Sequence, residues 1–274
     1  MTDFYTLLAR HYDTLFPAEP EISDFLSRTF SPARGSGTLV DAACGTGNYT
    51  HALSKRGFEC HGFDASEEMI GVALETGKLG TFEVRALEDL GGLAADSAGA
   101  GATQTEAASA RPQGLFCIGN SLPHLSDRAA VARFFQDAAG LLEPGSRIVV
   151  QIVNFARFDP ARYGRDKIEL PSVERPEVTM RRSYRSGGES RTVLFHSELT
   201  TSEGGRTSGV TPLLALGAEE LAEAAEEAGF GEIARFGSYD GTPYDPADSF
   251  LCILTATAAG AWTYSPAKLR GSAP

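Results

Sequence analysis

The chain has 274 residues, 42% of them hydrophobic, which is enough to bury a full core in one large domain or in one and a half. The formal net charge of −12 argues against a nucleic-acid partner, because such a surface needs a concentration of basic residues. The four cysteines and five histidines show no metal-ligand spacing, so we expect no bound metal. The first turn is polar and acidic, and no apolar run reaches the length of a membrane span. We therefore expect a cytoplasmic protein without a membrane partner.

Two helices are predicted ahead of the first strand. Residues 4–16 place Tyr5 and Tyr12 on one apolar helical stripe, which packing on a core would by itself explain. Residues 21–30 predict a second helix, and the segment 31–37 is rich in Ser, Pro and Gly and ends it.

The segment 38–50 organises the rest of the chain. Its first half is a short apolar run typical of a buried parallel strand, its second half is a turn with two glycines, and an amphipathic helix begins at Asn48. Such an arrangement forms a nucleotide-type pocket at the carboxyl end of a sheet. However, the dinucleotide fingerprint requires a third glycine where this chain has Thr50. Asp41, at the end of the strand, would repel a pyrophosphate and attract an amine.

A second carboxylate follows at the end of the next predicted strand. Residues 59–64 end in Asp64, which stands 23 residues beyond Asp41 and can accept hydrogen bonds from both hydroxyls of a ribose. Ser66 can cap the helix that follows, with Met69 on the buried side of that helix.

The middle of the chain combines strands, a helix and one unusual segment. Strands are predicted over 81–86, 115–118 and 147–153, and a strongly amphipathic helix is predicted over 127–142. Residues 91–114 are small and polar with few large apolar side chains, so we expect a flexible surface insertion there.

From Lys167 onward the period changes from helix to strand. The pattern predicts an antiparallel hairpin over 178–185 and 192–199, a strand over 206–216, a helix over 218–228 and final strands over 232–239 and 250–257. Arg182 and His196 lie in the hairpin, where they could read the charge of a substrate. Solvent-exposed or intersubunit positions are the alternative for both residues.

Three motifs resemble those of class I S-adenosylmethionine-dependent methyltransferases. The order Asp-Ala-Ala-Cys-Gly-Thr-Gly over 41–47 resembles their first cofactor motif, and residues 64–69 resemble the second. Residues 119–125, Gly-Asn-Ser-Leu-Pro-His-Leu, are similar to the fourth motif of glycine and sarcosine N-methyltransferases. The resemblance covers residues 5–156 and 213–257.

This resemblance implies a Rossmann-like α/β fold. The expected sheet has seven strands, is mostly parallel, has the order 3-2-1-4-5-7-6, and carries a small antiparallel β insertion. The expected parts are an N-terminal helical lid (1–36), an S-adenosylmethionine-binding core (37–156), a β substrate cap (157–212), the C-terminal part of the core (213–257) and a tail (258–274).

The resemblance also implies the residues of the site. Those expected to contact the cofactor S-adenosylmethionine, which leaves as S-adenosylhomocysteine, are Tyr12, Asp41, Ala43, Cys44, Gly45, Gly47, Asp64, Ala65, Met69, Leu87, Glu88, Ile118 and Gly119. Those expected to contact the substrate are Asn120, His124, Asn154 and Arg182. If the acceptor is a hydroxyl, the candidates for a general base are His124, Tyr12 and His196.

The function implied is methyl transfer by in-line displacement to a small-molecule nucleophile, with an amine as the favoured acceptor. In this scheme Asp41 anchors the amino group of the cofactor, Asp64 fixes the ribose, and Met69 and Leu87 enclose the adenine. A nicotinamide-dependent oxidoreductase and a non-catalytic S-adenosylmethionine-binding regulator are the alternatives. The expected partner is a small molecule, and a homo-oligomer could form through the β insertion.

Overall fold

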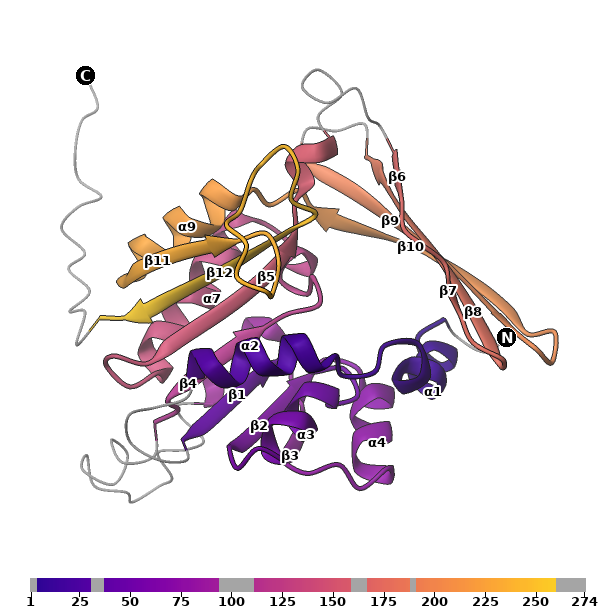
Figure 1. The fold of residues 1–274 in the computed structure, drawn as a ribbon, viewed down its shortest axis with the longest axis horizontal. Helices are drawn as coiled ribbons and strands as arrows, with labels where there is room; N and C mark the ends of the chain where they lie inside the picture. The colour runs from indigo at the N-terminus through magenta and orange to yellow at the C-terminus, as the bar shows by residue number, and fades with distance from the viewer. Residues whose placement is uncertain (1–3, 31–36, 94–110, 159–166, 188–190, 260–274) are drawn as a thin grey trace.

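A seven-stranded sheet with helices on both faces forms the centre of the molecule (Figure 1). The structure is a computed structural model, and it describes residues 4–30, 37–93, 111–158, 167–187 and 191–259 (the described residues). The predicted insertion 91–114 falls mostly outside these ranges, as does most of the predicted tail. Within the described residues, no helix is both long enough and apolar enough to cross a membrane.

The order of the central sheet is β11-β12-β5-β4-β1-β2-β3. Its strands are β1 (Thr38–Ala42), β2 (Glu59–Asp64), β3 (Thr81–Val84), β4 (Gly114–Cys117), β5 (Arg147–Val153), β11 (Phe230–Phe236) and β12 (Leu251–Ala258). Strands β1 to β5 pair in parallel, and β12 runs antiparallel to both β5 and β11. The predicted order 3-2-1-4-5-7-6 is therefore confirmed. The direction of strand order reverses between β1 and β4, which is where ligands bind in open α/β sheets.

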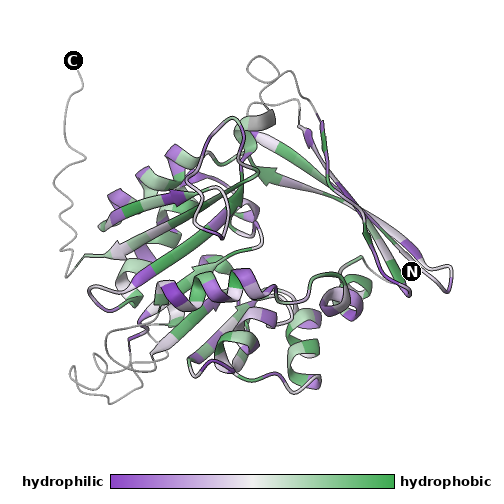
Figure 2. Cartoon of the chain, viewed as in Figure 1, coloured by the Kyte–Doolittle hydropathy of each residue, from purple (hydrophilic) through white to green (hydrophobic). Residues whose placement is uncertain are grey.

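The helices begin and end close to the predicted positions. They are α1 (Phe4–Leu15), α2 (Pro20–Phe30), α3 (Asn48–Ser54), α4 (Glu67–Glu75), α7 (Arg128–Leu141) and α9 (Ala218–Glu227), with short 3-10 turns η1 (Leu87–Asp89), η2 (Leu122–His124) and η3 (Phe155–Phe158). Side-chain caps start two of these helices, because Ser66 accepts a hydrogen bond from Met69 N and Asp127 accepts one from Ala130 N. Several helices carry hydrophilic and hydrophobic residues side by side, whereas the central strands are mostly hydrophobic (Figure 2).

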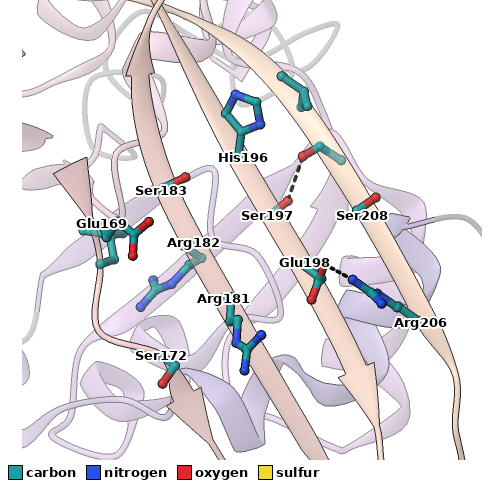
Figure 3. A pocket seen from close by; sticks show the side chains of 13 residues that line it. Glu169, Ser172, Arg181, Arg182, Ser183, His196, Ser197, Glu198, Arg206 and Ser208 are labelled. Carbon is teal, nitrogen blue, oxygen red and sulfur yellow. Dashed lines mark hydrogen bonds and ion pairs between the residues drawn. The ribbon is translucent and has the colours of Figure 1, made fainter. Parts of the chain in front are cut away.

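A second, five-stranded antiparallel sheet runs from the core towards α1 (Figure 1). Its strands are β6 (Lys167–Glu169), β7 (Val173–Glu174), β8 (Val178–Ser186), β9 (Thr192–Thr201) and β10 (Arg206–Leu214), in the order β10-β9-β8-β6 with β7 beside β8. The inner face packs on α1 and α4 through Met180 and Leu199, and on the end of β5 through Tyr184. Because side chains alternate along a strand, Ser183 and His196 belong to the opposite, outer face. The outer face holds a groove of about 550 Å³ (Figure 3).

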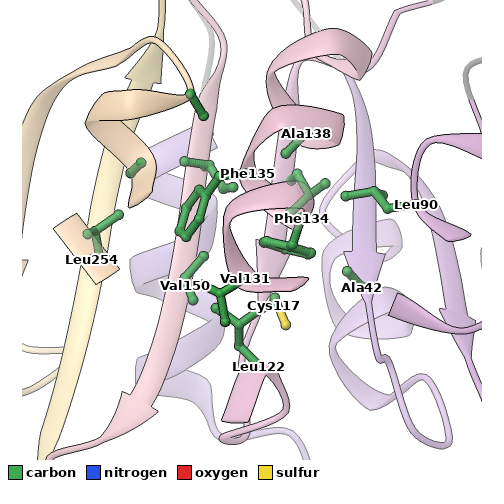
Figure 4. Close-up of a cluster of buried hydrophobic side chains, with 14 of the residues drawn as sticks. Ala42, Leu90, Cys117, Leu122, Val131, Phe134, Phe135, Ala138, Val150 and Leu254 are labelled. Atoms are coloured by element: carbon green, nitrogen blue, oxygen red, sulfur yellow. The ribbon is translucent and has the colours of Figure 1, made fainter. Parts of the chain in front are cut away.

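The main core lies between the central sheet and helices α7 and α9. Its buried side chains include Ala42, Leu90, Cys117, Leu122, Val131, Phe134, Phe135, Ala138, Val150 and Leu254 (Figure 4). A second cluster, with Phe25 of α2 and Leu53 of α3, covers the other face of the sheet. The predicted strand 232–239 corresponds to β11, which begins and ends earlier in the chain than predicted. The register of β11 with β12 shifts between Gly231 and Ala234, so the pairing is irregular at the start of the strand.

Candidate functional site

The glycine turn after β1 is built from residues with left-handed backbones. Ala43, Gly45 and Gly47 have φ values of 61°, 57° and 76°. The amide of Gly45 donates to the Oδ2 atom of Asp64 over 2.8 Å, so the turn is fixed to the end of β2. Gly47 precedes the first residue of α3, and the predicted strand–turn–helix arrangement is present.

Gly47→Ala tests the need for glycine at the end of this turn. A left-handed alanine costs about 1 kcal/mol, and displacing the Phe82 ring costs about 1 kcal/mol more. A Cβ atom built on Gly47 would lie 2.2 Å from Cε1 of Phe82, whereas one on Gly57, where φ is 95°, meets nothing within 4 Å. Urea unfolding should therefore show a larger loss for Gly47→Ala than for the control Gly57→Ala. Equal losses would contradict the steric argument.

Asp41 is buried at the end of β1, with only 3% of its surface exposed. Its Oδ2 atom accepts hydrogen bonds from Thr50 N over 3.1 Å and from Thr50 Oγ1 over 2.6 Å. Burial raises the pKa of Asp41 to about 7, the Thr50 hydrogen bonds oppose the shift, and the charge of Asp64 adds to it. Both Thr50 bonds fall on one carboxylate oxygen, so Oδ1 is the atom that can serve a ligand.

Thr50 occupies space that neighbouring glycines provide. A Cβ atom on Gly62 would lie 2.7 Å from Thr50 Oγ1, and one on Gly80 would lie 2.6 Å from Thr50 Cγ2. Thr50 thus stands where the dinucleotide fingerprint has its third glycine, and its side chain holds Asp41. Gly62 on β2 and Gly80 before β3 leave the space that the threonine side chain fills.

Asp64 lies where the ends of β1 and β2 meet. Its Oδ1 atom accepts from Ser66 N over 2.9 Å, and its Oδ2 atom accepts from Gly45 N. Burial raises the pKa of Asp64, and the hydrogen bonds from Ser66 and Gly45 oppose that shift. The carboxylate is therefore oriented by two backbone amides and keeps further lone pairs for a ligand.

Helix α1 lies over the glycine turn. The Tyr12 ring is 3.5 Å from the position of a Cβ atom on Gly45, and Asn48 Nδ2 donates to the carbonyl of Phe16 over 2.9 Å. Burial raises the pKa of Tyr12, and the charges of Asp64 and Asp41 raise it further. The phenol is therefore neutral at ordinary pH, which makes it a poor general base.

The remaining predicted cofactor residues differ in their surroundings. Met69 is buried between α1, α4 and the inner face, whereas Leu87 is buried in the main core. Among the others, Ile118 is buried and Cys44 is half-buried. The remaining three, Ala65, Glu88 and Gly119, are exposed.

Asn120 joins the ends of two central strands to the second sheet. It has a left-handed backbone with φ of 67°, and its Oδ1 atom accepts from Val153 N over 2.8 Å. Its side chain also forms a hydrogen bond with Tyr184 of β8. His124 is exposed nearby, yet desolvation lowers the pKa of its imidazole while the Asp64 carboxylate opposes that shift.

The other predicted substrate residues lie in different surroundings. The Asn154 amide donates to the carbonyls of Pro246 and Ser249, both over 2.9 Å, so it braces the segment before β12. Arg182 reaches under α1, with Cζ 4.9 Å from the centre of the Phe16 ring. His196 lines the outer groove (Figure 3), so the structure separates it from Tyr12 and His124.

Sequence reasoning missed Lys78 as a neighbour of the site, and it did not predict that Tyr184 of the hairpin bonds Asn120. Lys78 donates to Asp13 and to the carbonyl of Thr46, and Tyr184 bonds Asn120. Both contacts join segments far apart in the chain, and no local sequence pattern signals them. The isolated tyrosine of β8, flanked by arginines and serines, is the one hint of an inward-facing position.

The donor set favours a ligand with a diol and an ammonium group over a pyrophosphate. Two carboxylates, Asp41 and Asp64, flank the turn, and the nearest ammonium group, Lys78, is engaged by Asp13 and Thr46. A phosphate in this turn would face two carboxylates, and the ammonium of Lys78 is already engaged.

Known proteins share both the family and the fold. A family model described as a methyltransferase domain matches residues 17–186, more than half of the chain. No curated protein matches. Among solved structures, a S-adenosylmethionine-dependent methyltransferase from Clostridium acetobutylicum is 15% identical with a TM-score of 0.70, covering 94% of this chain and 100% of its own. The CcbJ methyltransferase from Streptomyces caelestis is 21% identical with a TM-score of 0.71, covering 92% and 96%.

A third similar structure is the sugar N-methyltransferase KedS8 from a Streptoalloteichus species. It is 19% identical with a TM-score of 0.64, and the match covers 94% of each chain. At these identities the structures establish the shared fold, and the family model adds the family. The chain belongs to the methyltransferase domain family, as a class I enzyme whose cofactor is S-adenosylmethionine.

Proposed function

We propose that this enzyme methylates a small-molecule amine that carries an anionic group. The observation that carries this proposal is Arg182, whose guanidinium lies over the Phe16 ring while its Nε atom has no hydrogen-bond partner among the described residues. A half-buried guanidinium whose Nε atom lacks a hydrogen-bond partner suits a carboxylate or phosphate group of a ligand. Two structures with this fold are described as an amino pentose methyltransferase and a sugar N-methyltransferase, which fits an amine acceptor.

The cofactor would lie across the carboxyl ends of β1, β2 and β4. When bound, S-adenosylmethionine supplies a methyl group on a sulfonium centre, which an amine nitrogen takes by in-line displacement. Asp64 would accept from the ribose hydroxyls, and Oδ1 of Asp41 would face the ammonium group. Gly45 and Gly47 leave room for close approach, and Met69 and Leu87 would flank the adenine.

The protein's main task is to position and desolvate the reactants. Tyr12, whose pKa is raised by burial, would cover the bound cofactor as a neutral phenol. A lowered pKa keeps His124 neutral at pH 7 but makes its imidazole a weak base, so the methylated ammonium would release its proton to solvent. A neutral amine needs no base before the methyl transfer.

We extend the proposal to the parts of the chain. Residues 1–36 would form a lid, and 157–212 a substrate cap over a core made of 37–156 and 213–257. The contacts of α1 with the inner face of the second sheet support this division. Oligomerisation through the second sheet is part of the same proposal.

Arg182→Met should lower kcat/KM for the acceptor by about tenfold while leaving the affinity for S-adenosylhomocysteine unchanged, because one charged hydrogen bond to the acceptor is lost. Methionine keeps most of the apolar stem that packs near Phe16. Arg185→Met is the matched control, since Arg185 is exposed on the outer face of the same strand. A loss of cofactor affinity equal to the loss of turnover would move Arg182 out of the acceptor site.

The acceptor class is tested by incubating the protein with S-adenosylmethionine and matched panels of amines and phenols, each with and without a carboxylate. Mass spectrometry should find methylated amine, with higher kcat/KM for the compounds that carry the carboxylate. Methylation of phenols alone would overturn the amine assignment. Equal rates with and without the carboxylate would overturn the role of Arg182.

A further inference from the structure

Lys78 is a buried cation between α4 and β3. Its side chain is only 8% exposed, and its Nζ atom donates to Asp13 Oδ2 over 2.6 Å and to the carbonyl oxygen of Thr46 over 2.7 Å. Burying an ammonium group is unfavourable unless it is paired and hydrogen-bonded. The two hydrogen bonds that Lys78 donates therefore hold the Asp13 carboxylate and the Thr46 carbonyl close to its ammonium group.

Asp13 closes a triangle of contacts. Its second oxygen, Oδ1, accepts from Thr46 Oγ1 over 2.5 Å, and Thr46 is fully buried. The triangle of Lys78, Asp13 and Thr46, the latch, joins three segments that are distant in the chain: α1, the glycine turn and the segment before β3.

The latch acts on both sides of the cofactor site. Thr46 lies between Gly45 and Gly47, so fixing its carbonyl fixes the turn whose Gly45 amide donates to Asp64. Asp13 follows Tyr12, whose ring lies over Gly45. A ligand held by Asp64 and Gly45 therefore lies under a helix that the same lysine secures.

We propose that Lys78 is a positioning residue that holds α1 over the cofactor and limits the rate at which S-adenosylhomocysteine leaves. Product release requires the end of α1 to lift, and lifting it breaks both contacts that Asp13 makes. The start of α1 has its own apolar anchor, because Leu8 and Ala9 pack with Met69 and Met180. Loss of the latch should loosen the end of α1 and leave the domain folded.

The test is Lys78→Met, which removes the charge and keeps the buried aliphatic stem. Stopped-flow measurement should show S-adenosylhomocysteine dissociating about tenfold faster, since removing one member of a hydrogen-bonded charge pair acts mainly on the off-rate. Hydrogen–deuterium exchange of the ligand-free protein should increase in residues 10–16. Lys55→Met is the control, because Lys55 is exposed at the end of α3 and, among the described residues, no hydrogen bond or ion pair joins its side chain to α1.

Asp13→Asn supplies a second route to the same answer. An asparagine can still accept from Thr46 but loses the charge that Lys78 meets, so its off-rate should also rise. The double variant Lys78→Met/Asp13→Asn should release ligand no faster than the faster single variant, because both substitutions disrupt the same ion pair between Lys78 and Asp13. Unchanged dissociation in the single variants would overturn the proposal, even if exchange in α1 increases, since the latch would then be purely structural. If Lys78→Met does not fold, Asp13→Asn alone decides between these outcomes.

Discussion

Asp64→Ala is expected to weaken S-adenosylhomocysteine binding by about 100-fold, or about 2.7 kcal/mol, the scale of losing charged hydrogen bonds in a desolvated site. The carboxylate now accepts from Gly45 N and Ser66 N, one bond on each oxygen. Its removal would therefore take away the acceptor for a ribose and release the glycine turn at the same time. Isothermal titration calorimetry measures the change directly.

Two further variants separate the ligand from the scaffold. Asp64→Asn keeps one acceptor oxygen, so its affinity should fall between those of Asp64→Ala and the unsubstituted protein. Glu75→Ala removes an exposed carboxylate at the end of α4 and should leave binding unchanged. If Asp64→Ala bound S-adenosylhomocysteine as tightly as the unsubstituted protein, the ribose assignment would have to be abandoned.

The central sheet was predictable because its signals are local. Strands β2 and β5 match their predicted bounds of 59–64 and 147–153, and Gly57 ahead of β2 and Pro144 and Gly145 ahead of β5 are the local signals for where they begin. The strand order followed from the family resemblance rather than from periodicity. The three-residue β6 and the two-residue β7 are too short for an alternating pattern to indicate their bounds.

The residues of the site were predictable only where a single short motif or the end of a predicted strand contains them. Asp41, Gly45 and Gly47 fall within one motif, and Asp64 ends the next strand. By contrast, the position of Arg182 under α1 and that of His196 in the outer groove depend on the register of β8 with β9. A shift of that register by one residue would exchange the two faces, so the sequence alone left both roles open.

The pKa of Asp41 predicts how stability depends on pH. The folded-state pKa of about 7 lies above the usual value of 3.8, so the folded protein binds more protons than the unfolded chain between these values. The contribution of Asp41 to stability therefore falls as pH rises through that window and is constant above about pH 7. Integration gives a loss on the order of 3 kcal/mol between pH 5 and pH 8.

Asp41→Asn should remove this dependence, because an amide does not titrate and can still accept a hydrogen bond from Thr50. Urea unfolding of both proteins at pH 5 and pH 8 measures the difference. The free energy of unfolding of Asp41→Asn, relative to the unsubstituted protein, should rise by roughly 3 kcal/mol from the lower to the higher pH. A constant difference would mean that Asp41 titrates alike in the folded and unfolded chains.

The same proton should govern the ligand. If the ammonium of S-adenosylhomocysteine requires an ionised Asp41, affinity should rise about tenfold per pH unit below pH 7 and level off above it, because the ionised fraction changes in that proportion. Calorimetry in buffers of different ionisation enthalpy at pH 6 should also detect release of about one proton on binding. Asp41→Asn should bind weakly at every pH and release none. A pH-independent affinity in the unsubstituted protein would place the ammonium elsewhere and leave Asp41 to hold Thr50 alone.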